Sequence, residues 1–256
     1  MVRTTSRALI TAVAALAVAL QPGTSGEAAP LPDGNLDCPH GGNFVSQACF
    51  HGSHIDVFAN WHNNGLTATT GDILDSGHIN HALWTFSGAP CGDRFVEVGL
   101  TKGFEGANVY TWYYARDRGD GNGGYSHTQY TGRTASPDGS NHEYHLKYAA
   151  TDATGGVYEI YLDSVKINAF PENHQGFGSC LSATGLEVQK HFLETSPRTG
   201  YSSDYFDAYN LRFTDTGGTQ YPWNNLNDWW RDFPCGVTTC FEGMYQGTDY
   251  WQSRHR

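Results

Sequence analysis

Between residues 55 and 214 apolar and polar side chains alternate in short runs, and this spacing of two residues is typical of β-strands. The clearest run is 142–150, HEYHLKYAA, in which Tyr144, Leu146 and Tyr148 share one face. Turns rich in Gly, Asn, Asp and Pro separate the runs. The pattern predicts strands within 55–61, 78–87, 94–116 (two strands), 125–131, 142–150, 157–162, 184–192 and 206–214.

Strands that are separated by turns, with few helices between them, are typical of an antiparallel sandwich. We therefore expect an all-β fold, an antiparallel two-sheet jelly-roll sandwich over residues 55–256. One short C-terminal helix is expected at 225–232, where Pro234 would stop it. Residues 29–54 contain several Pro and Gly, so we expect an irregular segment there, pinned by disulfides.

The first residues have the pattern of an export signal. Arg3 and Arg7 give a basic start, an apolar run from Ala8 to Leu20 follows, and small residues lead to Ala28. The apolar run is too short to span a bilayer as a helix. We expect residues 1–28 to be a signal peptide and the mature protein to be secreted.

Composition and charge narrow the possible partners. The chain has 31 Gly, 14% aromatic and 16% charged residues, which favours strands and turns. Its net charge of −11 argues against binding to nucleic acid or to anionic membranes. Neutral glycans, peptides and cationic partners remain possible, and we expect a monomer.

Six cysteines in an exported chain indicate three disulfides. The sequence does not choose among the fifteen possible pairings. As a working hypothesis we take two short loops and one long connection: Cys38–Cys49, Cys235–Cys240 and Cys91–Cys180. An even count leaves no cysteine over for a catalytic thiol.

The strongest candidate chemistry is a pair of carboxylates. Glu97 alternates with Val96 and Val98, and Glu187 occupies the same kind of position in the run 184–192. If their strands are neighbours, the two carboxyl groups could lie about 5–10 Å apart, as in glycosidases. The alternative is that both residues cover the solvated face of an antiparallel sheet.

We place aromatic and polar side chains beside this pair, on a concave face. Aromatic rings could stack on sugars and polar groups could orient them; the residues are Tyr110, Trp112, Tyr114, His145, Gln189 and His191. The leading hypothesis is a secreted protein that binds an extracellular polymer, most simply a polysaccharide. The alternatives are a hydrolase that uses Glu97 and Glu187, and a cell-surface structural protein without a ligand.

Metals and cofactors are not expected. Three histidine pairs have HxxH spacing, but residues three apart point to opposite faces of a strand. The loop with Asp120 and Asn122 has only part of the alternating ligand spacing of a calcium site. Nucleotide-binding and nucleophile-elbow motifs are absent from the sequence.

Four segments occur in an order similar to that of secreted bacterial concanavalin-like jelly-roll proteins and, distantly, of the glutamic peptidases. They are ALWTFSG (82–88), VEVG (96–99), VYTWYYA (109–115) and GLEV (185–188). The resemblance implies a jelly-roll fold. In the peptidases a glutamine amide holds the oxyanion while a glutamate activates water, and the glutamine position falls on Glu97. An ionised carboxylate there would repel the oxyanion, so the resemblance permits a two-carboxylate hydrolase only if one Glu stays protonated.

Overall fold

The computed structural model describes residues 44–63, 79–87, 94–102, 110–117, 126–152, 155–172, 179–188, 206–223, 229–231, 241–247 and 249–255. Within these ranges every regular element is a β-strand and every strand pair is antiparallel. No helix within these ranges is long and apolar enough to cross a membrane.

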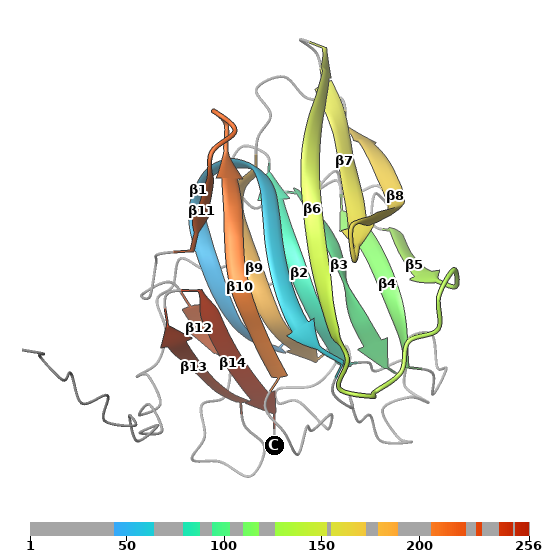
Figure 1. The fold of residues 1–256 in the computed structure, drawn as a ribbon, viewed down its shortest axis with the longest axis vertical. Helices are drawn as coiled ribbons and strands as arrows, with labels where there is room; N and C mark the ends of the chain where they lie inside the picture. The colour runs from blue at the N-terminus through green and yellow to red at the C-terminus, as the bar shows by residue number, and fades with distance from the viewer. Residues whose placement is uncertain are drawn as a thin grey trace, which may run out of the picture.

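The strands follow one another along the chain as Figure 1 labels them. Their bounds are β1 (Phe44–His62), β2 (Ile79–Ser87), β3 (Arg94–Lys102), β4 (Tyr110–Asp117), β5 (Ser126–Tyr130), β6 (Asn141–Asp152), β7 (Gly155–Leu162), β8 (Val165–Glu172), β9 (Ser179–Val188), β10 (Phe206–Asp215), β11 (Gln220–Pro222), β12 (Trp229–Arg231), β13 (Phe241–Gly247) and β14 (Tyr250–His255).

Strand β1 belongs to both layers of the sandwich. From Phe44 to His51 it pairs with β9, and from Asp56 onward it pairs with β10 on one side and β6 on the other. The register with β9 shifts between His51 and His54. Gly52 has a φ of 153° there, a conformation that residues with a Cβ rarely adopt. The bend at Gly52 therefore lets one strand serve two sheets.

The two layers can be followed from this shared strand. The first layer runs β1–β9–β2–β3–β4–β5, and β12 pairs with the other edge of β1. The second runs β14–β10–β1–β6–β7–β8, with β13 beyond β14 and β11 beside β10. Figure 1 shows β6, β7 and β8 at the upper right, with β6 next to β1. Trp112 of β4 and Tyr144 of β6 meet between the layers, where the indole Nε1 donates to the hydroxyl over 3.2 Å.

The main hydrophobic core lies between the layers. It contains Val96, Val98 and Leu100 of β3 together with Trp61 of β1 and Leu146 of β6. A smaller cluster covers the opposite face of the first layer, which we call the outer face: Cys49, Ala82, Trp84, Phe86, Tyr113, Ala115, Leu181 and Ala183. Both faces of the first layer therefore carry buried apolar side chains.

The predicted fold class is confirmed, and the structure corrects two details. The predicted helix is wrong where it is described, because Trp229–Arg231 is the edge strand β12, which pairs with Ser46–Ala48 of β1. A helix of one or two turns makes few internal hydrogen bonds, so pairing with a free strand edge is favoured. Residues 44–54 are not irregular, because they form the first part of β1. Residues 1–43, including the predicted signal peptide, lie outside the described ranges.

A buried histidine stabilises the bend in β1. His54 is fully buried; its Nδ1 donates to the carbonyl oxygen of Gly52 over 2.6 Å, and its Nε2 accepts from the hydroxyl of Ser182 over 2.7 Å. Both contacts suit the neutral ring. Burial lowers the pKa of His54 to about 4, against smaller opposing effects of the Gly52 carbonyl and Asp56. Burial also lowers the pKa of His81 to about 3.

These histidines make the fold sensitive to acid. Between pH 6.5 and about 4 these histidines bind protons in the unfolded chain but not in the folded chain. The free energy of unfolding therefore falls as the pH falls. Each group contributes a slope of up to about 1.4 kcal/mol per pH unit. We expect His54→Gln to remove one such contribution, measured by urea unfolding from pH 4 to 7. Leu83→Ala, which weakens the same core without removing a titrating group, should lower stability equally across that range. An unchanged slope in His54→Gln would contradict the assignment.

Candidate functional site

The outer face of the first layer carries the two candidate carboxylates. Glu97 comes from β3 and Glu187 from β9, and β2 lies between these strands. In the β2 register Trp84 is the partner of Glu97 and Asn80 is the partner of Glu187. Positions 80 and 84 of β2 share a face, so the two glutamates project from the same side of the sheet, staggered along β2.

Glu97 is buried in a partly aromatic environment. Its side chain is 4% exposed, and the hydroxyl of Tyr113 donates to its Oε2 over 3.2 Å. Burial raises the pKa of Glu97 to about 8; the nearby charge of Glu187 adds to this effect, while hydrogen bonds from Trp84 and Tyr113 oppose it. At neutral pH Glu97 is therefore mainly a neutral carboxylic acid with a hydrogen to donate.

Glu187 is half-buried and lies in more polar surroundings. The amide Nδ2 of Asn80 donates to its Oε1 over a long 3.5 Å. Among the described residues the buried Asn80 Oδ1 and Thr101 Oγ1 have no hydrogen-bond partner, and these two residues are cross-strand neighbours. A buried polar atom without a partner costs about 1–3 kcal/mol. These two atoms are therefore suited to hold a water molecule or a polar group of a substrate.

Between the two carboxylates the sheet surface has almost no side chains. Gly185, Ala82 and Gly99 are cross-strand partners on β9, β2 and β3. A Cβ on Gly99 would lie 2.2 Å from the carbonyl oxygen of His81, and one on Gly185 would lie 2.1 Å from that of Ser46. Only glycine allows this close approach of neighbouring backbones. The strip Gly185–Ala82–Gly99 thus separates Glu97 from Glu187 with nothing larger than a methyl group.

The structure brings the two predicted glutamates together but not the predicted aromatic residues. The register of β3 with β4 pairs Leu100 with Trp112 and Val98 with Tyr114. Trp112 is therefore buried in the core between the layers, and Tyr110 and Tyr114 pack against that core. Their placement beside Glu97 was wrong, because the bulkier rings of β4 fill the wide space between the layers. Tyr113 and Ala115 occupy the outer face instead.

The predicted polar ligand-binding residues also lie elsewhere. His145 belongs to β6 of the second layer and points away from the core that Leu146 enters. It stacks on Phe58 with ring centroids 3.9 Å apart and pairs with Asp56 at 3.3 Å. Its assignment to the site of Glu97 is therefore wrong. Gln189 and His191 lie outside the described residues.

Four residues of the site were not predicted: Asn80, Trp84, Thr101 and Tyr113. A signal for Asn80 and Trp84 exists in the sequence, because both alternate with the aliphatic Ile79 and Leu83. If the aliphatic side chains of this strand enter the core, the side chains that alternate with them lie on the opposite face, which is the face of Glu97. The position of Tyr113 depends on the register across the β3–β4 connection, which the alternation alone does not set.

The cysteines and possible metal ligands are described only in part. Cys49 is buried on the outer face, and no cysteine in the described ranges is free. The side chains of the other five lie outside the described residues, so the disulfide pairing stays a prediction. Among the described side chains no group of three or more His, Cys, Asp or Glu is placed to hold a metal ion.

The fold and this site define a jelly-roll β-sandwich with a carboxylate pair on the outer face of one sheet. Solved structures of the same architecture include scytalido-glutamic peptidase with a transition state analog inhibitor (13% identity, TM-score 0.51) and with a peptide based transition state analog (10%, 0.50). Each match covers 84% of this chain and 98% of the peptidase. A *Bacillus licheniformis* beta-glucanase matches with 13% identity over 64% of this chain and 68% of its own, at a TM-score of 0.39.

The expected resemblance in fold to the glutamic peptidases is thus confirmed. At 13% identity it establishes a shared fold and leaves the activity open. No family model matches the sequence, and neither does any curated protein.

Substitution of Gly99 tests the close approach of the strands. We expect Gly99→Ala to lower the free energy of unfolding by about 2 kcal/mol or more, because its Cβ would collide with the backbone of β2. Gly247→Ala is the matched control, because a Cβ there meets no atom within 4 Å. Its effect should stay within about 0.5 kcal/mol. Equal melting curves for the two variants would contradict this account of the strip.

The influence of Glu187 on Glu97 can be measured directly. We expect Glu187→Gln to lower the pKa of Glu97 from about 8, but not to the ordinary value of 4.5, because burial remains the larger cause. Carboxyl-carbon NMR of the labelled protein would follow the titration. Glu159→Gln, which removes a carboxylate from β7 in the second layer, should leave it unchanged. A Glu97 that titrates near 4.5 in the unsubstituted protein would contradict this description.

Proposed function

We propose that this protein is a secreted hydrolase in which Glu187 activates water and neutral Glu97 stabilises the oxyanion. One observation carries the proposal: a buried carboxyl group, Glu97, and a more accessible one, Glu187, project from the same face of one sheet, and burial raises the pKa of the first. Environments that give two neighbouring acidic groups different pKa values are characteristic of acid–base catalysis. The export-signal pattern of residues 1–28 supports the secreted location.

The proposed reaction is the hydrolysis of a peptide bond. The carboxylate of Glu187 takes a proton from a water molecule, and the water oxygen attacks the carbonyl carbon. The carbonyl oxygen becomes an oxyanion and receives a hydrogen bond from the carboxylic acid of Glu97. When the carbon–nitrogen bond breaks, the leaving amine takes the proton from Glu187, which restores the starting state of both groups.

Burial removes the objection that a carboxylate at position 97 would repel the oxyanion. That argument holds for an ionised group, whereas the pKa of about 8 keeps Glu97 neutral through most of the physiological range. A neutral carboxylic acid donates one hydrogen bond, as one N–H of a glutamine amide does. Glu97 can therefore serve where the glutamic peptidases have glutamine.

The substrate class that we propose is an extended polymer. The strip Gly185–Ala82–Gly99 places no side chain larger than a methyl group between the two glutamates along β9, β2 and β3, and Trp84 and Tyr113 lie beside Glu97. Asn80 Oδ1 and Thr101 Oγ1, which no described residue satisfies, lie on the side of Glu187 and can bond to polar groups of the substrate. The peptide based transition state analog bound by the structurally similar peptidase supports a polypeptide as the first substrate to test.

A polysaccharide is the second candidate, and the same raised pKa favours it. In a glycosidase a neutral Glu97 would give its proton to the leaving oxygen, and Glu187 would act as base or nucleophile. The two chemistries differ in one requirement: a peptidase needs Glu97 to donate a hydrogen bond, whereas a glycosidase needs it to lose a proton.

Two substitutions, assayed on casein and on insoluble polysaccharides, test the proposal. Glu187→Gln should lower the turnover number by about 100-fold or more on either substrate, because the base is lost. On casein, Glu97→Gln should keep activity within about tenfold, because an amide still donates a hydrogen bond. On a polysaccharide the same variant should be inactive, because an amide does not deliver a proton.

The pH profile provides a second readout. In the unsubstituted protein activity should fall above about pH 8 as Glu97 ionises, and Glu97→Gln should lack this fall on casein. Glu159→Gln serves as the control for loss of a carboxylate. Full activity in Glu187→Gln would overturn the proposal, and so would the absence of turnover on both substrates.

A further inference from the structure

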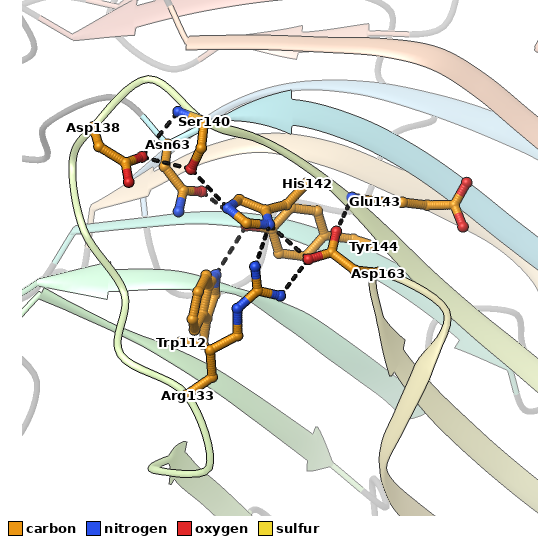
Figure 2. Close-up of polar contacts among 9 residues, drawn as sticks. All are labelled: Asn63, Trp112, Arg133, Asp138, Ser140, His142, Glu143, Tyr144 and Asp163. Carbon is orange, nitrogen blue, oxygen red and sulfur yellow. Dashed lines mark hydrogen bonds and ion pairs between the residues drawn. The ribbon is translucent and has the colours of Figure 1, made fainter.

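A second polar cluster lies at a different part of the sandwich, where the β5–β6 loop meets the turn between β7 and β8. Figure 2 shows Ser140, His142 and Asp163 in a row. Ser140 Oγ lies 2.8 Å from His142 Nε2, and His142 Nδ1 lies 2.7 Å from Asp163 Oδ2. This order of atoms, from hydroxyl through imidazole to carboxylate, is that of an activated serine nucleophile.

The carboxylate in this row is fixed from several sides. Asp163 Oδ1 accepts the backbone N–H of Glu143 over 3.0 Å, and the backbone N–H of Asp163 donates to the carbonyl oxygen of Glu143 over 2.8 Å. Asp163 Oδ2 is also paired with Arg133. Asp163 has a φ of 50°, which places it at the tip of the turn facing β6. The carboxylate is thus held in position to orient the imidazole.

The imidazole is also held by the core. His142 is 5% exposed, and its ring meets the edge of Trp112 with centroids 5.3 Å apart. Arg133 lies over the same indole, 5.0 Å from the ring centroid. These contacts restrict the ring while Ser140, which is half-buried beside exposed loop residues, remains open to solvent on one side. This combination of a rigid base and an accessible hydroxyl suits attack on a small external substrate.

We propose that Ser140, His142 and Asp163 form a second, independent active centre that hydrolyses carboxylic esters with a short acyl group. Ser140 Oγ attacks the ester carbonyl carbon, and its proton passes to His142 Nε2. The carbon–oxygen bond to the alcohol breaks, and the alcohol leaves with that proton. Water then attacks the acyl-serine and gives a proton to His142; when the bond from the acyl carbon to Ser140 Oγ breaks, His142 returns this proton to Oγ and the carboxylic acid leaves. Asp163 is a positioning residue that holds the tautomer and stabilises the imidazolium.

We assign the role of oxyanion donor to the side-chain amide of Asn63, whose backbone is paired with that of the segment that carries Ser140. Asn63 is 1% exposed, and its Nδ2 has no hydrogen-bond partner in the described part of the chain. Its backbone N–H donates to the carbonyl oxygen of Ser140 over 2.9 Å, and its own carbonyl oxygen accepts the N–H of Gly139 over 3.1 Å. Asn63 is therefore tied to the segment that carries the serine. A side-chain amide in this role is worth about 100- to 1,000-fold in turnover.

Asp138 competes for the proton of the nucleophile. The hydroxyl of Ser140 donates to Asp138 Oδ1, and the backbone N–H of Ser140 donates to the same oxygen over 2.9 Å. A hydroxyl proton directed at Asp138 is directed away from His142. Asp138 thus holds the serine in a resting state, and removing its carboxylate should make Ser140 more reactive.

Two assays test this proposal. The first is covalent labelling by a fluorophosphonate probe, with the labelled peptide located by mass spectrometry. The second is the hydrolysis of p-nitrophenyl acetate. The protein should be labelled at Ser140, and Asp138→Ala should be labelled at least about threefold faster. Ser140→Ala should lose the label, whereas Ser136→Ala, an exposed serine of the same loop, should keep it. Asp163→Asn, which tolerates the left-handed conformation, should lower the turnover number by about 100-fold with KM unchanged. Thermal melting controls for folding.

The Glu187→Gln variant separates this proposal from the first one. It should lose turnover of casein or polysaccharide and keep the full rate of labelling at Ser140, because the two centres share no residue. The proposal is overturned if neither the unsubstituted protein nor Asp138→Ala is labelled at Ser140. It is also overturned if Ser140→Ala hydrolyses the acetate ester at the unsubstituted rate.

Discussion

The backbone pairing of β1 is the constraint on which the rest of the structure depends. One half of this strand pairs with β9 in the first layer, and the other half lies between β10 and β6 in the second. All these partners lie far away along the chain, so their pairing requires the closure of long loops. The neutral ring of His54 connects the bend to Ser182 of β9, which fixes the point where the strand changes layers. A shared strand with one defined bend therefore sets the position of both sheets and of the core between them.

The candidate site follows from this arrangement because the first layer is buried on both faces. Its inner face packs on the second layer, and its outer face carries Trp84 and Tyr113 around Glu97. Two hydrogen bonds to Glu97 favour its ionised form, yet loss of solvent outweighs them and raises the pKa of Glu97 to about 8. Desolvation is thus the deciding effect. The proposed division of roles between Glu97 and Glu187 comes from their different burial and not from a difference in residue type.

The sequence was sufficient for the fold class, most strands and the face of each glutamate within its own strand, because alternation by twos reports which side chains share a face within one strand. It was not sufficient to relate the faces of neighbouring strands. In β4 the sets Tyr110–Trp112–Tyr114 and Thr111–Tyr113–Ala115 both alternate, and the pairing of Leu100 with Trp112 decided which set entered the core. Three large rings fill the space between the layers. The width of this space depends on how the two layers pack on each other, which the alternation within one strand does not show. For the same reason the alternation within β6 did not show that His145 belongs to the other layer.

The carboxyl groups of Glu97 and Asp163 are held in opposite protonation states by their different surroundings. Glu97 has one neighbouring anion and no cation among its described contacts, so burial leaves it neutral and able to donate. Asp163 is less buried: desolvation raises its pKa, but His142, Arg133 and a backbone N–H together outweigh this effect and hold the pKa below the ordinary value. A neutral acid suits stabilisation of an oxyanion, whereas an anion suits orientation of an imidazole. The same side-chain chemistry therefore supports two different roles, and the balance between burial and the cations and hydrogen-bond donors around each carboxyl group determines which role it has.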